Sequence, residues 1–503
     1  ESASGQRYRM LETLREYGLD RALETGQAHD ARRCHAEYFA AWVAELVDDC
    51  RGPREVETVD RMEEDHDNIR QALLWLLDSD GDVGVTCALA HHLRHFWDSR
   101  GHHTEAQAWR TRALDVAEDS NSEHVALVRA DRAVIYTHTT HLTQAQEDAE
   151  AAVSLSKEAG HAWGVALGVA ALGAVALKRR EYAVATRHFE SALRAARRKG
   201  AAADVAHLMH VRAWVTHHTG AIEQAWELAE EALDECARVG VLGGQAMCIL
   251  LKGVIRVDQQ RYAEAQEFLD KAWELHVHVK SQDQQAWNLF HRARIAIAEG
   301  DYVSAYSHAQ AYVPLARRLG RQKAVGWALE YSGKAAAASG QHATAADHYH
   351  AAQAVEGAER ANVLRARLGL FDVLCAQGNM SEASRQLAMT VDAVFDNESD
   401  EAQARCVEAY GRLAEHAGDY VTAARLLASA AAWRDAQPER PVYWGDRSAF
   451  WLFEASLAQE TRERVEAALS VDAFAAAWNA GRSLTLPEAR RAAEPTLGAR
   501  DAG

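Results

Sequence analysis

GDYVSA at residues 300–305 recurs with a single change as GDYVTA at 418–423. Looser copies occur at intervals close to forty residues, so that nine copies lie in one register. The other seven are GHHTEA at 101–106, THLTQA at 140–145, REYAVA at 180–185, GAIEQA at 220–225, QRYAEA at 260–265, GQHATA at 340–345 and GNMSEA at 378–383. Self-similarity at a fixed period of this size is the signature of a repeat protein.

Small residues mark the two segments that flank each copy. The sixth position is alanine in all nine copies: Ala106, Ala145, Ala185, Ala225, Ala265, Ala305, Ala345, Ala383 and Ala423. Seven residues later most repeats have a second alanine, at Ala113, Ala152, Ala192, Ala232, Ala272, Ala352 and Ala430, with Tyr312 and Thr390 as exceptions. Seven residues before the copies, Gly173, Gly253, Gly333 and Gly411 alternate with Ala133, Ala213 and Ala293. Because a spacing of seven keeps one helix face, each unit is predicted to be a helix, a tight turn and a second, closely packed helix.

This pattern resembles the tetratricopeptide repeat (TPR), which has a small residue in its first helix, a Gly-x-Tyr turn and an alanine early in its second helix. That family repeats every 34 residues, so each helix here is expected to be longer by nearly one turn. Strand-like alternation is almost absent and the chain has only six prolines, which also favours helices. We therefore predict an all-α fold, a superhelical α-solenoid of about nine TPR-like helix hairpins with a concave inner face.

Composition excludes several classes of function. The chain has 503 residues, 48% of them hydrophobic, and 55 Lys+Arg against 73 Asp+Glu give a net charge of −18. An acidic balance argues against direct contact with nucleic acid or with an anionic membrane. The seven cysteines are scattered and never form a CxxC pair, so we expect neither a disulfide framework nor a zinc ribbon and place the chain in the cytoplasm. The most apolar run, residues 162–177, is too short and too rich in Ala and Gly to span a bilayer.

The segments that flank the repeats resemble a second, larger family. RYRMLETLREYGLDRAL at 7–23, ARRCHAEYFAAW at 31–42, RGPREVETVDRMEEDHDNIRQALLW at 51–75 and FAAAWNAGRSLTLPEA at 474–489 are similar to STAND-type signalling ATPases of bacteria. That group includes LuxR-type and antibiotic-pathway regulators of actinobacteria. The resemblance implies the end of a winged-helix region with a linker helix at 1–23, a helical junction at 24–82, the solenoid at 83–435 and a C-terminal helical cap and tail at 436–503.

In that family a nucleotide-binding module and a winged helix precede the solenoid, and an effector domain, often DNA-binding, lies elsewhere. The chain has no GxxxxGK[ST] phosphate loop: Gly333-Lys334-Ala335 lacks both the upstream glycine and the hydroxyl that magnesium needs. We therefore expect no enzymatic activity and no cofactor in this segment. The resemblance implies that ATP or ADP and Mg²⁺ bind in the nucleotide-binding module of a longer protein.

The stretch EEDHDNIRQALLW, residues 63–75, raises the question of a metal or acid/base site. Glu63 and His66 are three residues apart, a spacing that places both on one helix face, as in di-metal bundles. Such a bundle needs a second Glu-x-x-His helix, which we do not find. We interpret the stretch as a polar junction with Ile69, Leu73, Leu74 and Leu76 facing the first repeats, and as a hinge to the ATPase. His91 and His95, at i and i+4, have zinc spacing but no third ligand, so we expect no metal site and no catalytic residue.

A binding site is better supported than a catalytic one. In tetratricopeptide-like solenoids the first helix of each pair lines the concave face, at positions that fall 13, 10, 6 and 3 residues before the turn. Aromatic side chains beside a few polar groups at these positions are typical of ligand sites, although tryptophans at this spacing also fit the core between repeats. The predicted site residues are His207, His210, Trp214, Trp287, Phe290, Arg294, Trp327, Glu330, Lys334, Arg365, Arg405 and Arg412.

Two functions remain open from the sequence. The first is a sensor whose concave face binds a small-molecule inducer, a peptide or a protein and so controls activation and oligomerisation of a STAND ATPase, in contact with the protein's own nucleotide-binding domain. The second is a TPR scaffold that recognises a protein without any small-molecule inducer. A ligand screen distinguishes them, because only the first predicts a metabolite or peptide that binds.

Overall fold

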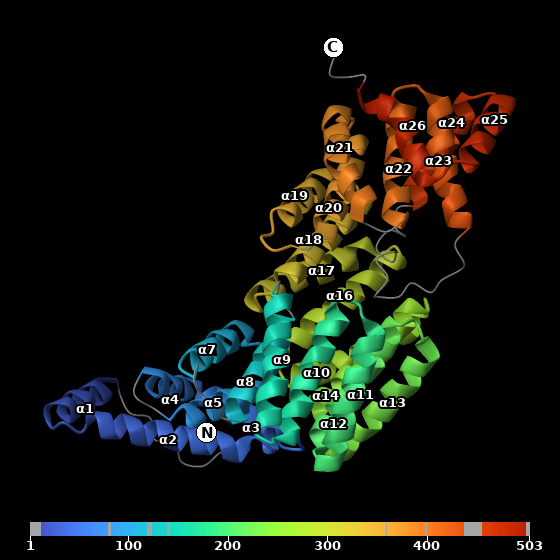
Figure 1. Cartoon of the computed structure of the whole chain (residues 1–503). Coiled ribbons are helices and arrows are strands. Elements are labelled where there is room, and N and C mark those ends of the chain that lie inside the picture. The colour runs from blue at the N-terminus through green and yellow to red at the C-terminus, as the bar shows by residue number, and fades with distance from the viewer. Residues whose placement is uncertain are drawn as a thin grey trace. The chain divides into compact units, whose positions relative to one another are not determined.

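The chain is described by a computed structural model that covers residues 12–78, 82–117, 123–137, 141–358, 360–397, 400–436 and 455–498. Throughout these residues the regular structure is helical, so the prediction of an all-α solenoid is confirmed (Figure 1). The chain forms two compact units, each described by itself below. The first comprises Glu1–Ile255 and Glu267–Gln285, and the second comprises Arg256–Gln266 and Ala286–Gly503.

The helices alternate in pairs with the predicted forty-residue period. The first helices of the pairs are α8 (Glu123–Tyr136), α10 (Ala162–Lys178), α12 (Ala202–His218), α14 (Leu242–Asp258), α16 (Gln282–Ala298), α18 (Gln322–Ala338), α20 (Arg360–Ala376) and α22 (Asp400–His416). The second helices are α7 (His103–Asp115), α9 (Leu142–Glu158), α11 (Tyr182–Lys199), α13 (Ile222–Val239), α15 (Tyr262–His278), α17 (Tyr302–Arg318), α19 (His342–Gln353), α21 (Met380–Asn397) and α23 (Tyr420–Asp435). Most of these helices have 17 or 18 residues. The repeat is therefore longer than 34 residues because its helices are long, as predicted.

Other helices flank the repeats at both ends. Before them come α1 (Glu12–Glu24), α2 (Ala28–Leu46), the 3₁₀ helix η1 (Asp49–Arg51), α3 (Glu55–Glu64), α4 (His66–Asp78), α5 (Val83–His92) and α6 (Arg94–Arg100). After them come α24 (Ala455–Ala468), α25 (Val471–Arg482) and α26 (Leu486–Gly498), which pack on α22 and α23 (Figure 1). The predicted winged-helix end at 7–23 lies outside the described residues up to position 11. In the described part of the chain, no helix combines the length and the apolar character needed to cross a membrane.

The geometry of the turn explains its sequence. Gly300 has φ +77°, a left-handed conformation that glycine adopts at low cost, and the Asp301 N–H closes the preceding helix on the Ala296 carbonyl at 2.8 Å. The Asp301 carboxylate then accepts a bond from the Ser304 N–H at 3.0 Å and so caps the next helix. The same glycine and aspartate recur in GDYVTA. The turn therefore ends one helix and starts the next within two residues.

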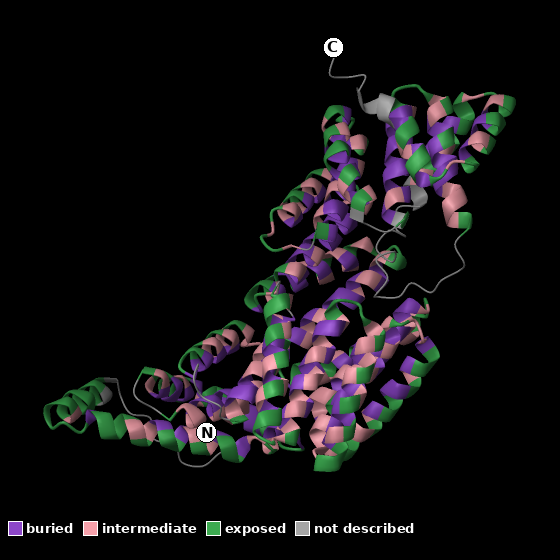
Figure 2. Cartoon of the chain, in the orientation of Figure 1, coloured by how far each residue is buried: buried purple, intermediate pink, exposed green. Residues whose placement is uncertain are grey.

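The recurring small residues lie where the helices of a pair meet. All nine alanines at the sixth position are 0% exposed. A Cβ on Gly333 of α18 would lie 2.8 Å from the Tyr349 ring of α19, so the glycine allows these two helices to approach closely. Figure 2 shows buried residues along the faces by which neighbouring helices such as α22 and α23 contact one another. In the junction, Ile69, Leu73 and Leu76 are buried as expected, but Leu74 is 37% exposed, so that assignment was wrong.

Candidate functional site

Three of the predicted site residues meet in an aromatic cluster in the second unit. The rings of Trp287 and Phe290 on α16 and of Trp327 on α18 have pairwise centroid distances of 5.7–5.8 Å. Phe290 is only 1% exposed, whereas both tryptophans are half-buried. Tyr312 and Tyr331 extend the cluster around Phe290, at 6.0 and 5.3 Å. The cluster therefore has a buried base and two tryptophans that reach solvent, and the core and binding interpretations both apply to it.

A fixed polar group adjoins this cluster. The Trp327 Nε1–H donates to the side-chain oxygen of Asn362 at 2.7 Å, and Arg365 donates to the same oxygen at 2.6 Å. Asn362 lies on α20 and is fully buried. Sequence reasoning missed Asn362 because it lies three residues before the first position of the predicted register in its helix. Its position one turn from Arg365 was the available signal.

Several charged residues of the predicted site form ion pairs between repeats. Arg365 donates from Nε to both carboxylate oxygens of Glu330 on α18, and the two residues are 6% and 1% exposed. Arg294 donates to the fully buried Asp258 at 3.0 Å. Lys334 is also buried, at 7% exposure. These contacts tie first helices of successive pairs together.

Two basic residues of the predicted site near the C-terminal end are paired with a carboxylate in the same way. Arg405 and Arg412 on α22 both donate to the carboxylate of Asp372 on α20. Glu408 accepts a bond from Arg434 on α23. Asp372 lies six residues before the turn glycine Gly378 and so occupies a position of the predicted register, but it was not among the predicted site residues. Arg405 and Arg412 therefore share one carboxylate partner on the neighbouring first helix.

The three predicted residues of α12 belong to the first unit. The Trp214 indole N–H donates to His210 Nε2 at 2.8 Å, which requires an unprotonated Nε2 and so a neutral His210 with its proton on Nδ1. Burial lowers the pKa of His210 to about 3. His207 lies on the exposed part of the helix, yet desolvation by the surrounding protein and the nearby Arg51 guanidinium lower its pKa to about 4. His210 and Trp214 therefore form a neutral, hydrogen-bonded pair and not a cationic site.

A further set of contacts, which sequence reasoning missed, joins the junction to the turns between repeats. Arg51 pairs with Asp204 at the start of α12 at 2.7 Å. The Glu55 carboxylate accepts a bond from the Gly243 N–H, in the first turn of α14, at 3.0 Å. A carboxylate at a helix N-terminus is favoured by the free N–H groups and by the helix dipole. Although burial alone would raise it, the pKa of Glu55 is lowered by bonds from His95 and from this N–H group.

The same pattern continues at the next turn. Asp60 of α3 accepts a bond from Lys280 at 2.8 Å. Arg100 of α6 donates to the Val279 carbonyl at 3.0 Å and also binds Asp60. The four pairs Arg51–Asp204, Glu55–Gly243, Asp60–Lys280 and Arg100–Val279 are called the junction contacts below. They connect the segment before the repeats to three successive turns, near 200, 240 and 280.

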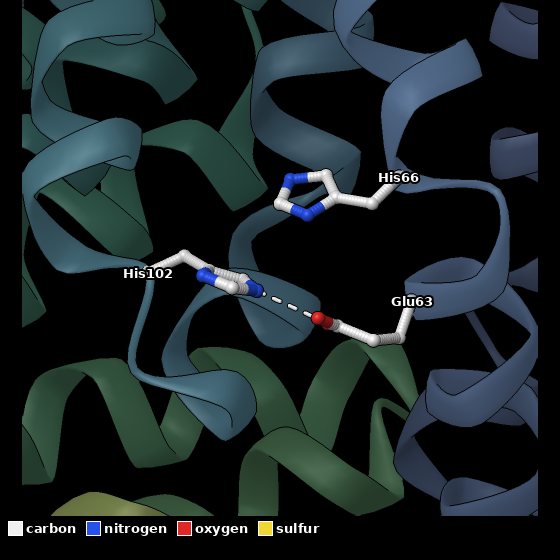
Figure 3. Close-up of side chains that lie close together, drawn as sticks. All are labelled: Glu63, His66 and His102. Atoms are coloured by element: carbon white, nitrogen blue, oxygen red, sulfur yellow. Dashed lines mark hydrogen bonds and ion pairs between the residues drawn. The ribbon is translucent and has the colours of Figure 1, made fainter.

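One group of side chains has a composition suited to a metal ion. Glu63 at the end of α3, His66 at the start of α4 and His102 at the N-cap of α7 bring one ligand atom each within 4.8 Å of one another (Figure 3). His102 Nε2 lies 3.1 Å from a carboxylate oxygen of Glu63. This hydrogen bond is the main reason that the pKa of Glu63 is lowered. The expectation of no metal site depended on the lack of a second Glu-x-x-His helix. The third residue comes instead from a repeat turn, GHHTEA.

No family model matches the chain. Over 127 residues, a quarter of the chain, it is 32% identical to candidate HTH-type transcriptional regulators of Mycobacterium bovis and Mycobacterium tuberculosis, and this match spans only 14% of their length. Solved structures with similar folds include a STAND protein with a tetratricopeptide repeat sensor from Pyrococcus horikoshii (12% identity, TM-score 0.45, 66% of this chain and 54% of that one). Another is the apo quorum sensor NprR of B. thuringiensis (14%, TM-score 0.43, 71% and 98%). At these TM-scores neither structure supports a functional argument.

Proposed function

We propose that this chain is the sensor segment of a cytoplasmic, STAND-type transcriptional regulator. In this proposal the repeats bind a small-molecule inducer, a peptide or a protein, and the bound state alters the contact between the repeats and the regulator's own nucleotide-binding domain. The match to HTH-type regulators supports the regulatory context. The segment itself performs no chemistry, and nucleotide would bind elsewhere in the longer protein.

The junction contacts are the observation that carries this proposal. A sensor must convert a change in its repeats into a change in the segment that leads to its output module. Here the three successive turns near 200, 240 and 280 each contact at least one side chain of η1, α3 or α6. Because TPR-like repeats contact mainly their neighbours, a small rotation between repeats is propagated along the array. Any change in the spacing of these turns must therefore strain or break the junction contacts.

The aromatic cluster is the place where a ligand is proposed to act. Trp287 and Trp327 offer half-exposed rings, and Asn362 and Arg365 hold the indole of Trp327 in one orientation. Rigid aromatic surfaces beside oriented polar groups bind organic ligands and peptide side chains with little loss of conformational entropy. A ligand seated across the two rings would bridge α16 and α18. It would thus fix the angle between two repeats of the second unit.

The energetic requirement is modest. A ligand shifts the regulator between inactive and active states only if it binds one state more tightly, by about 1.4 kcal/mol for each tenfold change in the ratio of the two states. Stacking on one or two tryptophan rings is worth about 0.5–1.5 kcal/mol per pair beyond the area that it buries. The cluster is therefore large enough to supply the difference.

The test is a calorimetric and thermal-shift screen of the chain against metabolites and short peptides, followed by variants. The Trp287→Ala/Trp327→Ala double variant should lose binding of any compound found, while Trp478→Ala, a half-buried tryptophan stacked on Phe474 in α25, should retain it. A folded double variant that binds unchanged would refute the site. If screens find no ligand and a pull-down yields one stoichiometric protein partner, the scaffold function replaces the sensor.

A further inference from the structure

We propose that Glu63, His66 and His102 form a three-ligand site for a transition-metal ion, with Zn²⁺ as the best chemical fit. The ligands come from the end of α3, the start of α4 and the turn before α7. In Figure 3 the three side chains converge from two sides on a common point between them. This site is independent of the aromatic cluster and of any ligand that binds there.

The distances are close to those that coordination needs. Zn²⁺ binds nitrogen at about 2.0–2.1 Å and carboxylate oxygen at about 2.0–2.2 Å, which places neighbouring ligand atoms roughly 3–3.5 Å apart. His102 Nε2 and the Glu63 oxygen are already 3.1 Å apart, and the three ligand atoms lie within 4.8 Å. The widest separation must therefore close by about 1–2 Å. Rotation of the exposed Glu63 and half-buried His102 side chains is sufficient, because neither is held in the core.

His66 is already oriented as a ligand. Its Nε2 lies 3.0 Å from Glu105, whose carboxylate also accepts two bonds from Arg70 and one from the Trp109 indole at 2.6–3.1 Å. A carboxylate held in this way is ionised and can only accept, so His66 Nε2 carries the proton. The lone pair of the neutral ring is then on Nδ1, and Figure 3 shows a ring nitrogen of His66 directed toward the other two side chains. Metal-bound histidines usually donate their second N–H to a carboxylate, which fixes the ring and strengthens the ligand.

The ligand set also selects the kind of ion. Two imidazoles and one carboxylate suit Zn²⁺, Cu²⁺ or Ni²⁺, whereas Ca²⁺ and Mg²⁺ require a shell of oxygen ligands. Arg100 Nε lies 3.9 Å from the Glu63 carboxylate, although the guanidinium is bonded to Asp60 and to the Val279 carbonyl. Its positive charge further disfavours ions that bind by charge alone. The exposure of Glu63 leaves a path for the ion and a fourth position for water.

A bound ion would act on the junction. Glu63 and His66 flank the corner between α3 and α4, and His102 belongs to the first repeat turn, so one ion would fasten that corner to the repeats. Asp60 of the junction contacts lies one helical turn before Glu63 on α3. Metal binding would therefore stabilise the docked form of the junction.

The experiment uses the untagged chain after removal of metals with EDTA and dialysis. Zn²⁺ is titrated in by calorimetry, and Co²⁺ is added in parallel because its visible absorption reports four- or five-coordinate nitrogen and oxygen ligands. The variants are His102→Gln and Glu63→Gln, both at solvent-accessible positions, so that loss of folding does not confuse the result. The matched control is His141→Gln, since His141 is the N-cap of α9 in the next repeat turn and lies against Tyr136.

We expect one Zn²⁺ per chain, a rise in melting temperature with Zn²⁺ and a Co²⁺ absorption band. His102→Gln and Glu63→Gln should each weaken Zn²⁺ binding at least tenfold and remove most of the Co²⁺ band, while His141→Gln should match the wild type. Absence of saturable binding would overturn the proposal. So would a Co²⁺ band of equal strength in His102→Gln, because it would assign the binding to other histidines of the chain.

Discussion

Arg365 on α20 and Glu330 on α18 form a buried ion pair, with the guanidinium Nε 3.0 and 2.9 Å from the two carboxylate oxygens. The same guanidinium donates to Asn362, which in turn accepts the Trp327 indole N–H. One arginine therefore links the contact between two repeats to the orientation of a tryptophan in the candidate site. The pair is structural first, and any role in binding acts through Trp327.

Replacing Arg365 by Met should destabilise the second unit strongly. The change leaves the Glu330 carboxylate buried and unpaired, which costs about 3–5 kcal/mol. Urea unfolding followed by circular dichroism should show the loss.

A double variant and a surface control make this prediction specific. Glu330→Leu/Arg365→Met removes both charges together and should recover much of the stability, as replacement of buried pairs often does. Arg385→Met, at an exposed arginine that pairs with the half-buried Glu382, should change the unfolding free energy by less than about 1 kcal/mol. A single Arg365→Met variant as stable as the wild type would contradict the assignment.

Gly481 on α25, like Gly333 on α18, lies where the packing leaves no room for a side chain. A Cβ there would lie 2.2 Å from the Arg425 carbonyl oxygen and 2.7 Å from its Cα, on the backbone of α23. Backbone atoms cannot rotate away, so Gly481→Ala should destabilise the unit by about 1–3 kcal/mol or more by overpacking. Gly18→Ala is the control: nothing lies within 4 Å of it, and on α1 the change should be neutral or favour the helix. Thermal unfolding of both variants tests this.

The repeat pattern was sufficient to predict the fold because its information is local. Gly300 and Asp301 end one helix and start the next whatever surrounds them. The alanines at the sixth position of the repeat are fully buried, and the seven-residue spacing between the small residues already placed them on one helix face. Leu74 is the exception: it was assigned to the inner face but is 37% exposed. It lies about 100° around the helix from Leu73 and so falls outside the face shared by Ile69, Leu73 and Leu76.

The candidate site was predicted less well, because its contacts cross from one repeat to another. Trp287 and Trp327 came together as a forty-residue spacing implies, and whether they bind a ligand stays a prediction. The Asp372 partner of Arg405 and Arg412 depends on how neighbouring helices are rotated, which the period does not specify. His102 meets Glu63 across 39 residues, between a junction and a turn, where no periodic pattern applies.

His210 and His218 on α12 predict a dependence of stability on pH. Burial lowers the pKa of both to about 3, below the usual value of 6.5. Below pH 6.5 the unfolded chain takes up protons that the folded chain does not, so stability is fully present above that pH and is lost as the pH falls. Each histidine should remove up to about 1.4 kcal/mol per pH unit between 6.5 and its folded pKa.

The variant His210→Gln tests this at one position. The glutamine oxygen can still accept the Trp214 indole N–H but does not titrate, so the variant should lose less stability than the wild type between pH 7 and 5.5. Urea midpoints measured across this range give the slope, and the carboxyl groups contribute little because they titrate lower. Parallel slopes for the two proteins would show that His210 is protonated in the folded state as well.

The pair Arg51–Asp204 offers a direct test of the junction contacts. Asp204 also lies 3.7 Å from Arg94, and although burial would raise its pKa, Arg51 and then Arg94 lower it, so it is a charged residue in a partly buried position. Asp204→Asn should weaken the docking of η1 and α3 by about 1–2 kcal/mol, which corresponds to an increase of roughly 5- to 30-fold in local opening. Hydrogen exchange followed by mass spectrometry should therefore accelerate in residues 49–64.

The control for this prediction is Asp234→Asn, at an exposed position on α13. It makes the same chemical change in the same unit and should leave exchange in residues 49–64 at the wild-type rate. Because Asp204 belongs to α12 and the affected residues precede α4, faster exchange confined to 202–210 would mean that the aspartate supports only its own helix. Faster exchange at 49–64 in Asp204→Asn alone would mean that a turn between repeats holds the junction in place, which is the mechanical step that the proposed sensor requires.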